Sequence, residues 1–137
     1  MPDRLYADLL FLKLGGSLIT DKTRPRTARL DLIAQLAREI ESVKYSNLGL
    51  KIVLGHGSGP FGHVPAKRYG TRQGVDSDQG WRGFAEVWYE AAVLNRIVID
   101  ALQNAGLPAI AFPPSAAVTV RDGQVTDWNL SPLVSAL

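Results

Sequence analysis

Apolar runs and amphipathic segments alternate along this chain of 137 residues. Residues 9–14 and 51–54 form short apolar runs that predict two buried strands, and residues 109–112 predict a third. Between the first two runs, one set of apolar residues recurs at helical spacing: Ile33, Leu36, Ala37, Ile40 and Val43. Because strands and helices alternate, the pattern predicts an α/β domain with a mainly parallel sheet.

A long helix is predicted from Trp81 to Ala105, because apolar residues recur there at helical spacing. These residues are Phe84, Val87, Trp88, Ala91, Leu94, Val98 and Leu102. The segment Gly106-Leu107-Pro108 then ends the helix. Residues 65–80, in front of the helix, are polar and contain glycine, so they predict a mobile connection or a lid.

The rest of the chain predicts a hairpin and the start of another helix. Strands are expected at residues 117–121 and 124–126, joined by a turn at Asp122-Gly123. Residues 130–137 follow a helical pattern that carries on to the last residue. We therefore expect the native polypeptide to continue beyond this point.

The composition is that of one soluble domain. With 46% hydrophobic residues, residues 1–137 are expected to bury a single core. The absence of cysteine excludes disulfide bonds and thiolate metal sites, and two histidines in one loop do not favour structural zinc. A net charge of +2 from scattered basic residues argues against nucleic acid as a partner. No apolar run reaches the length of a membrane span and no signal core is visible, which predicts a cytoplasmic protein without a membrane partner.

A glycine-rich loop after the second strand is the most informative part of the sequence. It reads Gly55-His56-Gly57-Ser58-Gly59-Pro60-Phe61-Gly62-His63 and contains both histidines. Glycines let backbone N–H groups approach an oxyanion that side chains would otherwise keep away, as phosphate binding requires. His63 adds a side chain that donates a hydrogen bond or carries a positive charge near neutral pH. His56, at the strand end, is expected to be mainly structural.

Another glycine loop, Gly15-Gly16-Ser17, follows the first strand; in chain order it is the first glycine loop, and residues 55–63 form the second. Lys13 at the strand end and Lys22 beyond the loop add two ammonium groups. Two strand-to-glycine loops in one small domain predict a single anion that is held from two sides. The alternative interpretation is that the glycines only form tight turns and that both lysines are solvated.

Two familiar phosphate-binding motifs are nearly matched. Residues 57–62 have the spacing of the dinucleotide fingerprint, G-x-G-x-x-G, and follow a strand. That fingerprint requires a helix that opens within the motif, whereas Pro60 and Pro65 are expected to interrupt one. Residues 16–23 resemble a P-loop, but Asp21 takes the place of its second glycine and would repel a phosphate. Neither motif is therefore predicted.

The order of these pieces resembles the amino acid kinase superfamily. The resemblance rests on Lys13 to Ser17 at the end of the first strand, on Asp21-Lys22, and on His56 to His63 after the second strand. The histidine after Phe61-Gly62 and the segment Pro113-Pro114-Ser115 are most similar to the isopentenyl phosphate kinase branch. The resemblance implies the N-terminal half of a three-layer αβα kinase domain with an open, mainly parallel sheet. The nucleotide-binding C-terminal half of such a kinase would then be absent from this chain.

The resemblance to this branch implies transfer of the γ-phosphate of ATP, with Mg2+, to the phosphate of isopentenyl phosphate, giving isopentenyl diphosphate and ADP. By resemblance, nucleotide binding is implied for Lys13, Gly15, Gly16, Ser17 and Gly59. Acceptor binding is implied for Gly57, Ser58, Gly62 and His63, with Phe84 and Trp88 beside the apolar tail. Catalytic roles are implied for Lys13, Lys22 and His63, without a protein nucleophile or a metal ligand. The resemblance also implies a homodimer at full length and an inactive isolated half.

Three interpretations fit the sequence. The first is a kinase that acts on a phosphorylated prenyl acceptor. The second keeps the fold but changes the acceptor to a phosphonate, a carboxylate or a nucleoside monophosphate, and the third is a non-catalytic phosphate-binding module. Ser58 and Pro60 depart from the glycine and the small residue that are usual in the branch. The aromatic residues Trp81, Phe84 and Trp88 also fit a simpler role in the core of the long helix.

Overall fold

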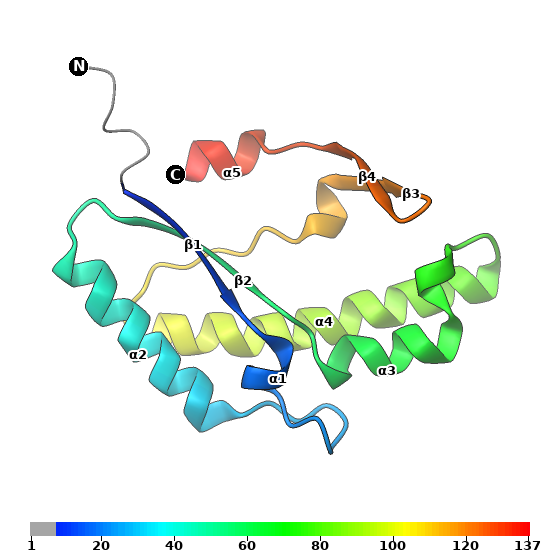
Figure 1. Cartoon of the computed structure of the whole chain (residues 1–137), viewed down its shortest axis with the longest axis horizontal. Helices are drawn as coiled ribbons and strands as arrows, with labels where there is room; N and C mark the ends of the chain where they lie inside the picture. Colours follow the sequence, from blue (N-terminus) through cyan, green and yellow to red (C-terminus); the bar gives the residue numbers. More distant parts are fainter. Residues whose placement is uncertain (1–7) are drawn as a thin grey trace.

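The computed structural model describes residues 8–137, which fold around two parallel strands (Figure 1). β1 (Leu9–Leu14) pairs with β2 (Lys51–His56), and α2 (Leu30–Ser46) lies between them in the chain. The α/β class and the parallel sheet that the sequence predicts are therefore confirmed. Residues 1–7 lie outside the described residues, and with them the start of the predicted domain and the segment for which no signal core is expected.

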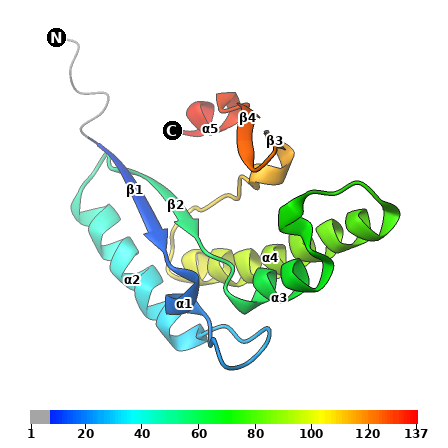
Figure 2. The ribbon, with the colours of Figure 1, turned by 45° about the vertical axis from the view of Figure 1, so that its right-hand side comes forward.

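The other elements are mostly helical. They are α1 (Gly16–Ile19), α3 (Pro60–Tyr69), η1 (Thr71–Gln73), α4 (Asp78–Asn104), η2 (Pro114–Ala116), β3 (Val118–Arg121), β4 (Gln124–Trp128) and α5 (Ser131–Ala136). α2 and α4 lie beneath β1 and β2, whereas the hairpin and α5 lie away from α2 (Figure 2). Among the described residues, no helix has both the length and the apolar composition that a bilayer crossing requires.

The core lies between the end of β1 and the helices α2, α3 and α4. Its buried residues are Leu14, Ile19, Ile33, Ala37, Phe61, Leu94, Val98, Leu102 and Leu107. Those in α2 and α4 occupy the helix faces that the spacing of apolar residues predicts. On the opposite face of β1, Phe11 is 71% exposed. Lys13 shares that open face, because side chains alternate along a strand.

Leu94 offers a direct test of this core, because its side chain is fully buried in α4. Leu94→Ala is expected to lower the free energy of unfolding by about 2–5 kcal/mol, since the removed atoms leave a cavity. Leu48→Ala is the control: Leu48 is 90% exposed, and its replacement should change the same quantity by less than about 0.5 kcal/mol. Equilibrium unfolding in urea measures both values, and equal losses would contradict this assignment of the core.

A helix occupies part of the segment that the sequence predicts as a connection. α3 begins at Pro60 and continues through Pro65 to Tyr69, so the prediction of an irregular connection at residues 65–80 is wrong for its first part. Pro60 suits the first helical position, because its fixed φ is helical and an N–H there would lack a partner. Pro65 is buried and α3 packs on α4, so burial of this helix offsets the hydrogen bond that proline cannot donate.

The same helix changes the argument about the dinucleotide fingerprint. A helix does open after Gly59, contrary to the expectation that the two prolines interrupt it. The fingerprint nevertheless stays incomplete. It needs a second strand that follows the glycine loop and ends in an acidic residue, but no strand lies between that loop and Asp76 or Asp78. α4 itself begins at Asp78, earlier than predicted, where the Ser77 hydroxyl accepts the Gly80 N–H at 3.1 Å.

The last part of the chain agrees with the sequence in one element and differs in another. β3 and β4 form the predicted antiparallel hairpin about Asp122-Gly123, and both turn residues have positive φ, 51° and 75°. The strand predicted at residues 109–112 does not form, because these residues pair with no strand within residues 8–137. An apolar run supplies the side chains of a strand, but a partner must supply its hydrogen bonds.

Candidate functional site

The two glycine loops lie against each other at the carboxyl ends of β1 and β2. The parallel pairing continues into the loops, since the Gly57 N–H donates to the Leu14 carbonyl at 2.9 Å. A Cβ atom on Gly16 would lie 2.7 Å from the Gly59 nitrogen, and one on Gly57 would lie 2.6 Å from the Gly16 nitrogen. Side chains do not come this close to backbone atoms, so both positions require glycine.

A buried threonine, Thr20, packs against both glycine loops where they meet. Thr20 is fully buried, and its hydroxyl donates to the Gly16 carbonyl at 2.5 Å. A Cβ on Gly59 would run into the Thr20 side chain, and Gly59 also adopts a φ of 49°, which favours glycine. Thr20 is not among the residues that the sequence predicts for the site. A lone threonine after a glycine loop gives no signal that distinguishes a buried packing residue from a surface one.

Backbone N–H groups remain free where the loops meet. Within residues 8–137, the N–H groups of Gly16, Ser17, Ser58 and Gly59 donate to no backbone acceptor. Gly16 and Ser17 begin α1, and Gly59 is the residue before α3. Unpaired N–H groups at such positions attract anions, because the groups carry partial positive charge and no side chain blocks the approach. The structure therefore brings together the two loops from which the sequence predicts an anion site.

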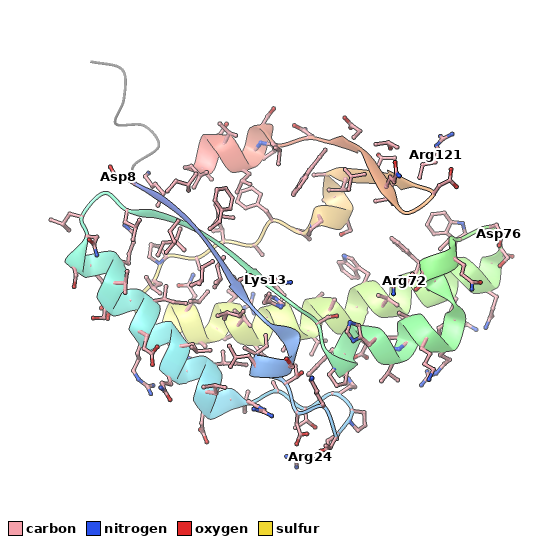
Figure 3. The ribbon with its side chains drawn as sticks, in the orientation of Figure 1. Asp8, Lys13, Arg24, Arg72, Asp76 and Arg121 are labelled. Carbon is pink, nitrogen blue, oxygen red and sulfur yellow. The ribbon has the colours of Figure 1, made fainter. Side chains whose placement is uncertain are left out.

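Lys13 lies at the carboxyl end of β1, opposite Gly55 of β2, and its side chain is exposed on the open face of the sheet (Figure 3). The residue is thus adjacent to the first glycine loop and free of an internal salt bridge within the described chain. Its ammonium group is available to an anion that approaches from the open face.

Lys22 lies on a longer loop that two contacts fasten at its base. The Asp21 N–H donates to the Thr27 carbonyl at 2.9 Å, and Arg26 Nε donates to Glu90 Oε2 of α4 at 2.6 Å. Lys22 itself is exposed. Figure 3 shows Arg24, from the same loop, at its outer tip and well away from Lys13. Lys22 forms no salt bridge within the described residues, so its ammonium group is free to meet an anion.

Asp21 organises the turn next to Lys22. Its carboxylate accepts from the Thr23 hydroxyl at 2.6 Å, from the Thr23 N–H at 2.8 Å and from Arg24 Nε at 2.8 Å. These hydrogen bonds, with that of the Thr23 hydroxyl first, hold the pKa of the Asp21 carboxyl well below its usual range. Asp21 is therefore a charged turn residue, and within the described chain it forms no ion pair with Lys22.

His63 lies in the first turn of α3, directly after the second glycine loop. The backbone N–H of His63 donates to the Gly59 carbonyl at 3.0 Å, and the imidazole side chain is exposed. Ser58 packs on the same turn, since a Cβ on Gly62 would lie 2.5 Å from Ser58 Oγ. The loop thus presents an imidazole and a hydroxyl at one end of α3.

The aromatic residues of α4 are not core residues. Trp81, Phe84 and Trp88 are 59%, 45% and 49% exposed, so the simpler interpretation of them as core is wrong in this structure. The rings of Trp81 and Phe84 meet edge to face at 5.7 Å. Trp88 Nε1 donates to Ser115 Oγ at 3.0 Å, which links α4 to the 113–115 segment that the resemblance singles out. Phe84 and Trp88 therefore offer exposed apolar surface.

Comparisons with known proteins agree with the family resemblance that the sequence shows. The amino acid kinase family matches residues 8–137. The isopentenyl phosphate kinase of Methanocaldococcus jannaschii is 34% identical over 130 residues, which cover 88% of this chain and 49% of that relative. The isopentenyl phosphate kinase of Methanothermobacter thermautotrophicus is 33% identical over 135 residues, which cover 94% of this chain and 49% of that relative. The chain thus spans about half the length of the curated relatives it matches.

Solved structures extend the likeness to three dimensions. A crystal structure of the T. acidophilum isopentenyl phosphate kinase product complex superposes with a TM-score of 0.75 at 31% identity, covering 93% of this chain and 49% of that one. Another X-ray structure of isopentenyl phosphate kinase gives a TM-score of 0.82 at 32% identity, covering 94% and 53%. These matches confirm the fold that the resemblance implies.

Proposed function

The chain belongs to the amino acid kinase family, and on this premise we propose that it is the acceptor-binding half of a kinase for isopentenyl phosphate. The observation that carries the proposal is the contact between two glycine loops, which leaves N–H groups of both loops without an internal partner. The choice of acceptor is supported by the curated relatives and solved structures, which are isopentenyl phosphate kinases. The complete protein would transfer the γ-phosphate of ATP and release isopentenyl diphosphate and ADP.

The first glycine loop and the lysines would serve the donor side. Phosphoryl transfer requires little covalent chemistry from a protein, so positioning and neutralisation of charge dominate. Lys13 and the N–H groups of residues 15–17 would face the ATP phosphates. Lys22 would neutralise charge that develops in the transition state. This last role requires the exposed Lys22 ammonium group to reach the phosphates when ligands bind.

The second glycine loop would serve the acceptor. Gly57 and Ser58 would contact the acceptor phosphate, and Gly59 would reach the donor phosphate. Gly62 would let the first turn of α3 come close to the acceptor phosphate. His63 would donate a hydrogen bond to the acceptor phosphate, and the exposed rings of Phe84 and Trp88 would meet the prenyl tail. Because the acceptor is itself a phosphate, its own oxygen attacks the γ-phosphorus and no side chain has to act as a nucleophile.

Mg2+ is expected to accompany ATP, where substrate phosphates, water and one or two carboxylates usually hold it. Within residues 8–137, no three His, Cys, Asp or Glu side chains are grouped so that they could hold a metal ion. Asp21, the acidic residue of the Lys22 loop, uses both carboxylate oxygens for Thr23 and Arg24. The roles proposed above therefore use no metal ligand from this part of the chain.

The proposal is tested with the complete protein, ATP, Mg2+ and four acceptors: isopentenyl phosphate, an alkyl phosphonate, a carboxylate and a nucleoside monophosphate. ADP release gives kcat/KM, and ³¹P spectra identify the product. Isopentenyl phosphate is expected to give the highest value and a diphosphate product. A higher value for another acceptor would reassign the substrate, and phosphate binding without ADP release would favour a non-catalytic module. Residues 1–137 alone are expected to bind the acceptor weakly without turnover.

His63 provides the sharpest test of the acceptor site. His63→Ala in the complete kinase is expected to weaken isopentenyl phosphate by about 10- to 150-fold, because a hydrogen bond to a charged group contributes about 1.5–3 kcal/mol. ATP affinity should stay nearly unchanged, and His63→Gln, which keeps a neutral donor, should recover part of the loss. Calorimetric titration measures all three proteins. Equal acceptor affinities would remove His63 from the site.

A homodimer and a cytoplasmic location for the complete protein remain predictions. Analytical ultracentrifugation tests the first, and fractionation of cells that express the complete protein tests the second.

A further inference from the structure

His56 stands between the second glycine loop and α4. It is the last residue of β2, and its side chain is half-buried. One ring nitrogen, Nδ1, lies 3.0 Å from the Gly57 carbonyl oxygen. The other, Nε2, lies 3.0 Å from Nδ2 of Asn95 in α4. Both ring nitrogens of this histidine are therefore engaged, one by the loop and one by the long helix.

The two partners together select one tautomer of the ring. A carbonyl oxygen can only accept, so Nδ1 must carry the proton that it donates to Gly57. In the neutral imidazole, Nε2 is then an acceptor, and Asn95 must donate to it through its amide nitrogen. Turning the Asn95 amide around would place its oxygen against the lone pair of Nε2. The Nδ1–H tautomer with the observed amide orientation thus satisfies every group in the neutral chain from Asn95 to Gly57.

This chain of hydrogen bonds fixes the direction of one peptide unit in the loop. The Gly57 carbonyl and the Ser58 N–H belong to the same planar trans peptide, so they point in opposite directions. With the carbonyl held by His56, the Ser58 N–H points away from the ring and has no backbone acceptor within residues 8–137. The first glycine loop also packs against this peptide unit: a Cβ on Gly16 would lie only 3.3 Å from the Gly57 carbonyl carbon. The peptide therefore has little room to rotate.

We propose that Asn95 and His56 are positioning residues of the phosphate site: Asn95 sets the tautomer of His56, and His56 turns the Gly57–Ser58 peptide so that the Ser58 N–H faces a bound phosphoryl group. The inference deepens the proposed function and rests on it for the identity of the anion. It assigns His56 a role beyond the structural one that the sequence suggests. Neither residue touches the phosphate, and both act through the orientation of the peptide.

Asn95→Leu tests the first link, because leucine has a similar volume and cannot donate. Long-range ¹H–¹⁵N spectra of the full chain report which ring nitrogen of His56 carries the proton. The wild type is expected to show protonated Nδ1, and Asn95→Leu is expected to populate the Nε2–H tautomer. Asn104→Leu is the matched control, because it makes the same change on α4 at an exposed position without a contact to His56. A wild-type ring with its proton on Nε2 would overturn the proposal.

Titration of inorganic phosphate and of isopentenyl phosphate, followed through the Ser58 and Gly59 amide signals, tests the second link. Asn95→Leu is expected to weaken both ligands by about tenfold, which corresponds to one neutral hydrogen bond, while Asn104→Leu should bind as the wild type does. His56→Asn should bind nearly as well as the wild type, because its amide nitrogen replaces Nδ1 as donor to Gly57. His56→Leu should bind as weakly as Asn95→Leu or more weakly.

The outcomes separate the two proposals. If phosphate binding depends on Asn95 but isopentenyl phosphate binds no better than inorganic phosphate, the substrate is wrong and the positioning role stands. If isopentenyl phosphate binds better and Asn95→Leu leaves its affinity unchanged, the positioning role is wrong and the proposed function stands. If neither ligand shifts the Ser58 or Gly59 signals of the wild type, both are wrong.

Discussion

Lys13→Ala is expected to lower kcat of the complete kinase by about 10²–10³, with little change in the KM of the acceptor, because one preorganised charge on the developing transition state is lost. Lys13 is exposed beside the first glycine loop and has no competing salt bridge within the described chain. Lys22→Ala is expected to behave in the same way if its loop approaches the phosphates. Steady-state kinetics on both variants measure the two effects separately.

Lys51→Ala is the matched control for these lysines. Lys51 lies on the same sheet and is also exposed, but it begins β2 at the far end from the glycine loops. Its replacement should leave kcat near the wild-type value. A Lys13 variant that also kept wild-type kcat would show that Lys13 is only a solvated surface residue. If Lys13 matters and Lys22 does not, the neutralising role proposed for the Lys22 loop is wrong.

Gly57→Ala is expected to lower kcat by about 10², because a misplacement of reacting groups by roughly 1 Å has a cost of this size. The new Cβ would lie 2.6 Å from the Gly16 nitrogen and 3.0 Å from its Cα, so the two loops must move apart. The free energy of unfolding should also fall by about 1–3 kcal/mol, as it does when a packed contact is overfilled.

Gly55→Ala is the control for this substitution. Gly55 lies two residues before Gly57 and belongs to β2. A Cβ on Gly55 would meet no atom within 4 Å. It should change neither kcat nor the unfolding free energy substantially. Kinetics and equilibrium unfolding on the two alanine variants decide the matter. If Gly57→Ala retained wild-type kcat, the close contact between the loops would have no part in catalysis.

Helices α2 and α4 and the hairpin could be predicted because their signals are local. The apolar face of α4 is visible in the spacing of Leu94, Val98 and Leu102, and these three residues are buried. The turn at Asp122-Gly123 is likewise written in two residues that tolerate positive φ. The strand at residues 109–112 could not be judged in the same way, because a strand depends on a partner elsewhere in the fold. The helix through Pro65 depends on tertiary packing that proline statistics do not contain.

Within the candidate site, too, some features of the glycine loops could be predicted from the sequence and others depend on the rest of the fold. Their presence after two strands is plain in the sequence, but which glycines are required is not. A Cβ on Gly15 would meet nothing within 4 Å, whereas one on Gly16 would meet the backbone of Gly59 and Gly57. Asn95 and Glu90 give no signal at all, because each is a polar residue on a long helix, and only the folded chain brings them to His56 and Arg26.

The two contacts from α4 restrict how the length of this helix can change. Glu90 holds the Lys22 loop through Arg26, and Asn95 holds the second glycine loop through His56. One inserted or deleted residue between them would rotate one anchor against the other by about 100° around the helix axis. Substitutions in the intervening turn that keep the helix and the buried Leu94 leave both anchors in place, whereas a change of length would release one loop or the other. Insertions and deletions within residues 90–95 should therefore not be tolerated.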